Sequence, residues 1–382
     1  MENIIFQSNP SLDTLKSSIE KIQNNSKSII ILSCDNNNYN TEEFSSILKN
    51  IKTPIIGGIF PQIIFENKNY EQGDIIISLQ DELDITIIKE LSQKADDLED
   101  EIEDRIGDLE DETNSMFVFV DGLTKNINEL ISSLFNNFGL NINYIGGGAG
   151  SLSFEQKPVI ISNEGLVQDC AILALSKNQI NLGVKHGWFE ISDSIKVTKS
   201  DSNVVEELNY KPAFEVYKEI VEKHSGKTFT DENFFDIAKG YPLGINKISG
   251  EAVVRDPIIL EDNKLICVGD VPVNSYVNIL GGSLDSLTTA ASQASKESNA
   301  NNKESFTLFI DCISRVLFLE EDFTKELDIV YSDNKKLVGA LTLGEIANNK
   351  KHYLEFYNKT SVIGNIIEWI HQKSTQRYLK YH

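Results

Sequence analysis

The chain has 382 residues, of which 40% are hydrophobic, enough for one large core or two medium ones. Its formal charge of −23 argues against nucleic acid and anionic membranes as partners, because like charges repel. Its four cysteines lie far apart, with no CxxC motif or Cys/His cluster that could bind a metal, so we expect reduced core residues.

The elements predicted in chain order give a mixed α+β protein. The sequence starts without a basic flank and apolar leader, and no apolar window approaches about 20 residues, so we expect a cytoplasmic protein without membrane insertion. Short β-branched runs alternate with helical patterns, as in an α/β fold. Strands are expected at Ser28–Cys34, Pro54–Phe65, Asp74–Leu79, Met116–Val120, Asp169–Leu175, Ile180–Val184, Glu251–Val254 and Phe306–Leu319. Helices are expected at Leu12–Ile22, Glu42–Asn50, Asn126–Phe138, Pro212–His224, Leu284–Ser298 and Glu320–Val330.

Three stretches share one pattern, in which a strand leads to Asp, a helix follows, and a second strand runs into glycine. The aspartates are Asp35, Asp121 and Asp311. The glycines are Gly57-Gly58, Gly146-Gly147-Gly148, and Gly339 with Gly344. The pattern predicts repeated β-α-β-β units, two in the first part and one in the second, that form two associated sheet-containing domains. The alternative is a chance recurrence of similar strands.

The predicted domain boundary lies in the helix near residues 212–224. We expect a first domain at 25–215, a second at 216–365, and a C-terminal helical tail at 366–382. Residues 94–112 carry eleven acidic side chains and keep apolar residues at helical spacing, which predicts an acidic helix. A solvated face is the first interpretation of this helix, and a docking surface for a basic partner is the second.

The motifs of several enzyme classes are absent from the sequence, namely GxSxG, a Walker-type loop, HExxH and strict GxGxxG. The closest feature is IGGGAGS at 145–151, whose backbone N–H groups could cradle an anion. A tight turn that lets backbone approach a ligand or another strand is an equal alternative.

Two short motifs and one ion pair are candidates for a binding site. His186-Gly187-Trp188 could line a pocket, with the ring of His186 as a hydrogen-bond partner or metal ligand, although a packed turn is the commoner role. Arg255-Asp256-Pro257 could present a guanidinium to a carboxylate or form an internal ion pair. Arg315 and Glu345 are expected to pair, because a charge inside an apolar run is costly without a partner.

The order of the motifs resembles one known family. The series IGGGAG, DCAILAL, GVKHGW, KVTKSDSNVVEELNYKPAFEVY, GYPLGI, VVRDP, LICVGDVPVNSYVNIL, DCISR, LGEI and FYNKT is similar to the FIST family, both its amino-terminal and carboxy-terminal parts. The resemblance covers roughly residues 25–365. FPQII stands where the first repeat of the family has a TxGEI-like stretch, which puts Gly57-Gly58 in doubt as a ligand contact.

The resemblance implies a bacterial sensory protein that binds a small, amino-acid-like ligand and signals through a separate partner such as a histidine kinase or cyclase. It also implies an alternative, a haem-based nitric oxide sensor with His186 as iron ligand. A third possibility is an acidic protein-interaction module without a small ligand. An enzyme is not expected, since the best nucleophile and base are Cys312 and His186, which nothing in the sequence brings together. The residues expected to line or brace the pocket are Gly147, Gly148, His186, Trp188, Arg255, Asp256, Arg315 and Glu345.

Overall fold

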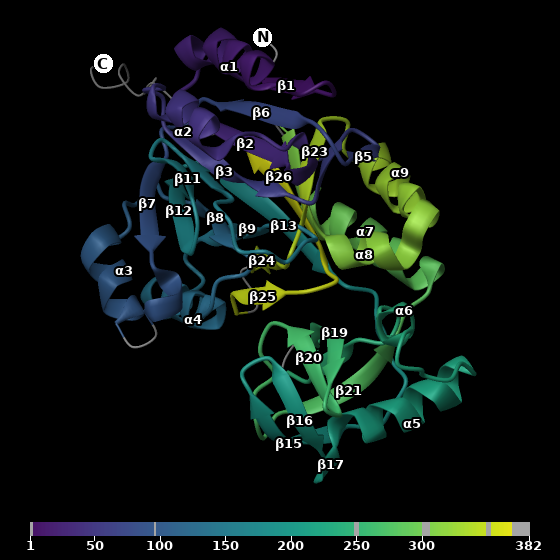
Figure 1. Ribbon diagram of the computed structural model, residues 1–382. Coiled ribbons are helices and arrows are strands. Elements are labelled where there is room, and N and C mark those ends of the chain that lie inside the picture. Colours follow the sequence, from purple (N-terminus) through teal and green to yellow (C-terminus); the bar gives the residue numbers. More distant parts are fainter. Residues whose placement is uncertain (1–2, 95–96, 248–251, 300–305, 349–352, 369–382) are drawn as a thin grey trace, which may run out of the picture.

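The fold contains three six-stranded sheets and one eight-stranded sheet, with helices around them (Figure 1). The computed structural model describes residues 3–94, 97–247, 252–299, 306–348 and 353–368. The expected mixed α+β class is confirmed. Among the described residues, no helix is both long and apolar enough to cross a membrane.

The three six-stranded sheets have the same strand order. In the first sheet it is β1 (Ile4–Gln7), β6 (Asp74–Leu79), β2 (Ser28–Cys34), β3 (Ile55–Phe60), β10 (Ile160–Ser162) and β11 (Gly165–Val167). In the second sheet it is β7 (Asp84–Lys89), β12 (Cys170–Ser176), β8 (Ser115–Asp121), β9 (Asn143–Ala149), β24 (Glu345–Ala347) and β25 (Glu355–Tyr357). In the third sheet it is β13 (Gln179–Lys185), β26 (Ser361–Ile367), β22 (Phe306–Cys312), β23 (Leu337–Thr342), β4 (Gln62–Phe65) and β5 (Lys68–Tyr70).

A parallel strand pair with a helical crossover forms the centre of each sheet. The pairs are β2–β3, β8–β9 and β22–β23. Their crossovers are α2 (Thr41–Lys49), α4 (Ile127–Phe138), and α8 (Ile313–Leu319) with α9 (Phe323–Asp333). A further helix precedes each pair, namely α1 (Leu12–Ile22), α3 (Leu98–Ile106) and α7 (Leu284–Ser298). The repeat predicted from the sequence is therefore confirmed, and it is longer than β-α-β-β.

Each sheet is completed by a hairpin from another repeat. The hairpin β4–β5 of the first repeat extends the third sheet, β10–β11 of the second extends the first, and β24–β25 of the third extends the second. The exchange is cyclic, so the three repeats form a closed ring of mutual contacts.

The strands alternate between a shared core and separate helical layers. In β8, Phe117 and Phe119 point into a core cluster that takes residues from all three sheets, while Met116 and Val118 pack under α3 and α4. Both faces of these strands are therefore buried, which explains their uninterrupted apolar runs.

The register of the repeats differs from the alignment of aspartates made on the sequence. A Cβ atom at Gly57, Gly146 or Gly339 would lie within 2 Å of the carbonyl oxygen of the neighbouring strand, so these glycines are equivalent. The oxygens that they face belong to Ile31, Val118 and Phe309. Counting three residues on from each of these oxygen-bearing residues, the equivalent positions of the three repeats are Cys34, Asp121 and Cys312. The aspartates at 35, 121 and 311 are therefore not equivalent.

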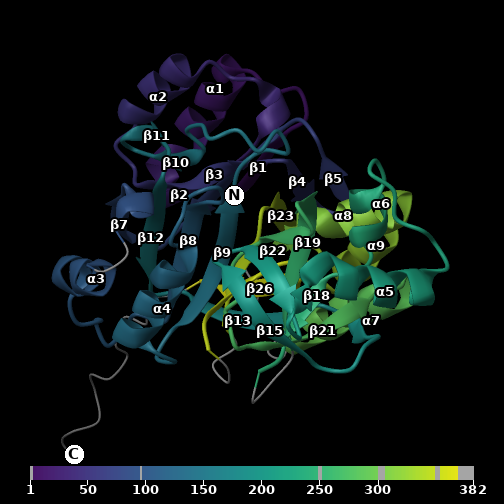
Figure 2. The same cartoon turned by 60° about the horizontal axis from the view of Figure 1, so that its bottom comes forward.

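The third repeat is interrupted by a separate unit, residues 187–283, that we term the barrel module; it lies below the sheets in Figure 1 and comes forward in Figure 2. Its strand β21 pairs with both β15 and β18, which closes six strands into a barrel. Its strands are β14 (Phe189–Glu190), β15 (Ile195–Asp201), β16 (Val204–Leu208), β17 (Lys211–Pro212), β18 (Leu243–Ile245), β19 (Val253–Glu261), β20 (Lys264–Val268) and β21 (Tyr276–Gly281). Its helices are α5 (Ala213–Ser225) and α6 (Phe234–Ala238).

Several predicted boundaries are wrong. The strand expected at Phe306–Leu319 ends at Cys312, and the rest of that apolar run forms α8. Arg255-Asp256-Pro257 lies within β19 rather than after a strand. The predicted domain limit at 215/216 does lie within a helix, α5, as expected, and it stays a prediction; β26 pairs with β13 of the first part. Residues 366 and 367 end β26 instead of beginning a helical tail, and residues 369–382 lie outside the described residues.

Candidate functional site

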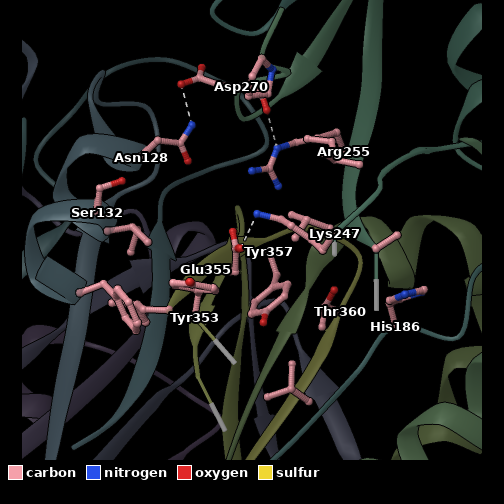
Figure 3. A pocket seen from close by; sticks show the side chains of 18 of the residues that line it. Asn128, Ser132, His186, Lys247, Arg255, Asp270, Tyr353, Glu355, Tyr357 and Thr360 are labelled. Carbon is pink, nitrogen blue, oxygen red and sulfur yellow. Dashed lines mark hydrogen bonds and ion pairs between the residues drawn. The ribbon is translucent and has the colours of Figure 1, made fainter. Parts of the chain in front are cut away.

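A cavity of about 830 Å³ lies between the barrel module and the second sheet (Figure 3). Helix α4 supplies one wall with Asn128, Ser132 and Phe135. Strand β19 supplies Arg255, and β25, which packs against α4, supplies Glu355. Residues from three distant parts of the chain thus converge on one space, as is typical of ligand sites between structural units.

Arg255 presents a partly free guanidinium to this cavity. The side chain is only 4% exposed, and its Nε donates a hydrogen bond of 2.9 Å to the carbonyl oxygen of Asp270. Nη1 donates to the carbonyl oxygens of Val254 and Phe356 at 3.0 and 2.9 Å. Among the described residues, Nη2 has no hydrogen-bond partner. Burial lowers the pKa of Arg255, and the negative charges of Glu355 and Asp270 oppose this shift.

Two carboxylates face the same cavity. Glu355 forms an ion pair with Lys247, and Asp270 accepts a 2.6 Å hydrogen bond from Nδ2 of Asn128. Figure 3 shows these two pairs on either side of the Arg255 guanidinium. Positive and negative side chains therefore both line this cavity.

His186 lies on the wall of the same cavity, beside Thr360 and apart from Arg255 in Figure 3. Its Nδ1 accepts a 2.9 Å hydrogen bond from the backbone N–H of Trp188, and its Nε2 is buried. A haem iron needs an unhindered imidazole nitrogen about 2 Å away. Neither ring nitrogen is open in this way, so His186 does not fit the role of iron ligand.

A second cavity, of about 1030 Å³, lies on the other side of β19. Asp256 lines it, whereas Arg255 lines the first cavity, because neighbouring side chains of a strand point to opposite faces. The structure thus brings Arg255 and His186 to one cavity but assigns Asp256 to another.

Arg315 lies at the centre of a buried polar cluster. Its Nη2 and Nε bind the two carboxylate oxygens of Glu326 at 2.6 and 3.1 Å, and Nε lies 3.3 Å from Asp311. Its Nη1 donates to the carbonyl oxygen of His186 at 2.7 Å. The predicted Arg315–Glu345 pair is wrong, because Glu326 on α9 takes this place. With every guanidinium nitrogen used, Arg315 braces the wall instead of offering a donor to a ligand.

Glu345 is fully buried, and no Lys, Arg or His among the described residues forms a salt bridge with it. Its carboxylate accepts hydrogen bonds from the hydroxyl of Thr342 at 3.0 Å and the backbone N–H of Thr360 at 3.1 Å. Burial raises the pKa of Glu345 to about 8, although these hydrogen bonds oppose the shift. The equivalent positions in the other two hairpins are Ile63 and Ile160, so only the third repeat carries a titratable group here.

Cys312, the candidate nucleophile, is a protonated thiol. Burial raises its pKa well above the usual value, and the negative charge of Glu345 adds to this shift. A thiol reacts as its thiolate, and the lowering of this pKa by Lys359 is smaller than the effects of burial and Glu345. No group of three or more His, Cys, Asp or Glu side chains in the described ranges could hold a metal ion.

The sequence analysis missed the buried ammonium of Lys359. Its Nζ lies 3.2 Å from the carboxylate of Asp256 and 5.1 Å from the ring centroid of Trp188. Trp188 in turn donates from Nε1 to the carbonyl oxygen of Lys359 at 3.1 Å. The FYNKT motif contains this lysine, but its partner Asp256 lies far away in the sequence, so nothing local indicated the pair.

The glycine-rich strand does not expose a row of free N–H groups. Gly148 donates its N–H to the carbonyl oxygen of Gly344 at 2.8 Å, and Gly147 lies opposite Glu345 in the β9–β24 pairing. Neither Gly147 nor Gly148 lines either cavity described above. Of the two interpretations of this motif, an anion-binding loop and a close approach of backbone to another strand, the structure shows the second, between β9 and β24.

The missed residues of the first cavity are the polar side chains of Asn128, Lys247, Asp270 and Glu355. They occur in unremarkable polar contexts, and only the fold brings them together.

Comparisons with known proteins agree with this architecture. The model of the FIST N domain matches residues 28–211, and that of the FIST C domain matches residues 213–348. An uncharacterized protein of Methanocaldococcus jannaschii is 25% identical over 302 residues, covering 72% of this chain and 58% of that protein. The chain thus spans less than two thirds of the length of this relative. On the strength of both matched domains, the chain belongs to the FIST family, whose domains are associated with sensory reception and signal transduction.

Proposed function

We propose that the protein is a receptor for a small zwitterionic metabolite of the amino-acid class, which binds in the cavity beside Arg255. The observation that carries the proposal is the Arg255 guanidinium, which is fixed by three hydrogen bonds and whose Nη2 has no partner among the described residues. A guanidinium held in this way is pre-organised for a carboxylate, so little conformational entropy is lost on binding.

The ammonium group of the ligand is assigned to the carboxylates of Glu355 and Asp270. Lys247 is 39% exposed at its side chain and can turn toward solvent, which would release Glu355 for the ligand. Asp270 keeps its hydrogen bond from Asn128 and still offers lone pairs. A ligand held by these groups contacts both the barrel module, through Arg255 and Asp270, and β25 of the second sheet, through Glu355, next to Asn128 of α4.

In this proposal, ligand binding changes the position of the barrel module relative to α4, and this change is the signal. A ligand that contacts both walls stabilises the arrangement in which they are close, and a separate partner such as a histidine kinase or cyclase reads that arrangement. The four cysteines are free and buried, which supports a reducing compartment such as the cytoplasm.

The test is a thermal-shift and calorimetric screen of the full chain against the common amino acids. We expect at least one to raise the melting temperature, and we expect Arg255→Gln to weaken its binding more than tenfold, about 1.4 kcal/mol or more. Arg105→Gln, on the exposed face of α3, is the matched control and should bind as the unaltered protein does.

Ligand analogues separate the two ends of the site. The methyl ester of the bound amino acid should lose binding through Arg255, and the analogue without the amino group should lose the contribution of Glu355 and Asp270. If Arg255→Gln unfolds, Arg255→Lys keeps the charge and removes the forked geometry. Unchanged affinity in a folded Arg255 variant, or no binding across the whole screen, would exclude this ligand class.

A further inference from the structure

The cavity beside Arg255 has an aromatic end as well as a charged one. Phe135 and Tyr353 line it together with Arg255, Asp270 and Glu355. Phe135 is half-buried and Tyr353 is 63% exposed, so both rings present surface that a ligand can reach. The charged groups account for the backbone atoms of an amino acid, and the two rings are left for its side chain.

The two rings already contact each other. Their centroids lie 4.8 Å apart, and their planes are inclined by 55°. Phe135 belongs to α4, and Tyr353 belongs to the segment just before β25. Aromatic rings prefer offset or edge-to-face neighbours, and large apolar side chains that stay exposed at a cavity mark places where something binds. The pair can therefore accept a third ring.

Helix α4 sets the distance between the two ends of the cavity. Asn128, Ser132 and Phe135 are four and three residues apart, so they share one face of the helix, and all three line the cavity. Asn128 is hydrogen-bonded to Asp270 at the charged end. Seven residues of α-helix span about 10 Å, so Phe135 lies two turns away from that end.

The segment before β25 gives a second and shorter measure. Tyr353 precedes Glu355 by two residues, and two residues of extended chain cover at most about 7 Å. In Figure 3, Tyr353 lies beyond Glu355 as seen from Arg255. A ligand with its ammonium at Glu355 needs a long side chain to reach these rings. The methyl group of alanine is too short, whereas a phenyl or indole group covers the distance.

Charged side chains fit this end less well than aromatic ones. An acidic side chain is disfavoured because the face of an aromatic ring carries negative charge. A cationic side chain would be attracted to the rings, but Lys185 and Lys247 line the same cavity and repel a second positive charge. We propose that the site selects aromatic amino acids, with Phe135 and Tyr353 as the residues that determine this specificity. This inference rests on the proposed receptor function and names its ligand class.

The experiment compares five amino acids by isothermal titration calorimetry on the full chain, namely phenylalanine, tryptophan, alanine, glutamate and arginine. We expect phenylalanine or tryptophan to bind at least tenfold more tightly than alanine, because the added ring is buried against two others. Alanine that binds as tightly as both aromatic ligands would overturn the specificity and leave the receptor function standing. Arginine as the tightest ligand would mean that the rings hold a cation instead. Absence of binding by all five would overturn both proposals.

Variants of Tyr353 assign the preference to the rings. Because this side chain is mostly exposed, Tyr353→Ala should fold, and it should weaken binding of the aromatic ligand at least fivefold while alanine binds as before. Tyr353→Phe keeps the ring and should retain the preference. Tyr210→Ala is the matched control, since Tyr210 is 78% exposed between β16 and β17 and is not among the described residues that line the cavity. An unchanged preference in Tyr353→Ala would contradict the assignment.

Discussion

Nδ2 of Asn128 donates a hydrogen bond of 2.6 Å to Oδ2 of Asp270, across 142 positions of the sequence. Asn128 lies in the first turn of α4, and Asp270 follows β20 of the barrel module, where its other oxygen accepts from Ser202 at 3.0 Å. The bond therefore ties the barrel module to the second sheet at the wall shared by both cavities.

Removal of this bond should loosen the barrel module. We expect Asn128→Ala to cost about 1.5 kcal/mol, because the acceptor is a carboxylate, and to speed amide hydrogen exchange in β20. Hydrogen exchange followed by mass spectrometry measures the second effect. Asn136→Ala on the same helix, whose amide donates to the exposed Glu99, is the control. Equal exchange in both variants would mean that the bond does not hold the module.

The ion pair between Arg315 and Glu326 should be the most sensitive polar contact in the protein. Both side chains are fully buried, so Glu326→Ala leaves an uncompensated charge and should cost about 3–5 kcal/mol. Urea unfolding measures this difference. Glu321→Ala, at an exposed position five residues earlier, should change stability by less than about 0.5 kcal/mol. A small effect at Glu326 would show that Asp311 alone can hold the guanidinium.

Glu345 should make stability depend on pH. Its pKa of about 8 in the folded protein exceeds the value of 4.5 expected in the unfolded chain, so the folded state holds the proton more tightly. Stability contributed by this proton is full below pH 4.5 and is lost as pH rises through 8. The raised pKa of Asp74, about 6, acts in the same direction at lower pH.

The isosteric variant Glu345→Gln isolates this effect. Between pH 6 and pH 8 the unaltered protein should lose up to about 2 kcal/mol more stability than the variant, because the titration of Asp74 is common to both proteins and cancels in the comparison. Urea unfolding at the two pH values gives the comparison. If the free energy of unfolding changes equally with pH in both proteins, Glu345 has an ordinary pKa and the prediction is wrong.

A side chain at Gly146 should disrupt the close contact between β8 and β9. A Cβ atom there would lie 1.7 Å from the carbonyl oxygen of Val118, so Gly146→Ala must push two paired strands apart. We expect a loss of more than about 4 kcal/mol or failure to fold. Gly107→Ala is the control, because Gly107 has a φ of +67° but open space around it, and should cost about 1 kcal/mol. Circular dichroism with thermal unfolding distinguishes the two.

Local elements were the most predictable part of this protein. The bounds of α1, β2, β6 and α7 follow directly from apolar spacing and from polar residues at their ends. Ser11 and Ser283, for example, cap their helices through hydrogen bonds to the third residue of the helix. At Phe306–Leu319 this reasoning failed, because an apolar run carries no mark of where the strand ends and the buried helix begins.

Pairing between repeats could not be predicted in the same way. Nothing local to β4 indicates that its partner is β23, some 270 residues later, because any apolar strand satisfies the same backbone hydrogen bonds.

The residues of the candidate site could be predicted only in part, for a related reason. Arg255 was singled out because it precedes Asp256-Pro257 next to an expected strand, while the partners Asp270 and Glu355 become informative only once β19, β25 and α4 are placed together.

The exchange of hairpins among the three repeats has a consequence during synthesis. During synthesis three strands leave the ribosome well before their partners. These pairs are β9 with β24, β13 with β26, and β4 with β23. At about 5–20 residues per second, roughly ten to forty seconds pass between the making of β13 and that of β26. Throughout that interval the nascent protein carries unpaired apolar edges, which makes it a natural client for chaperones that shield open β-strands.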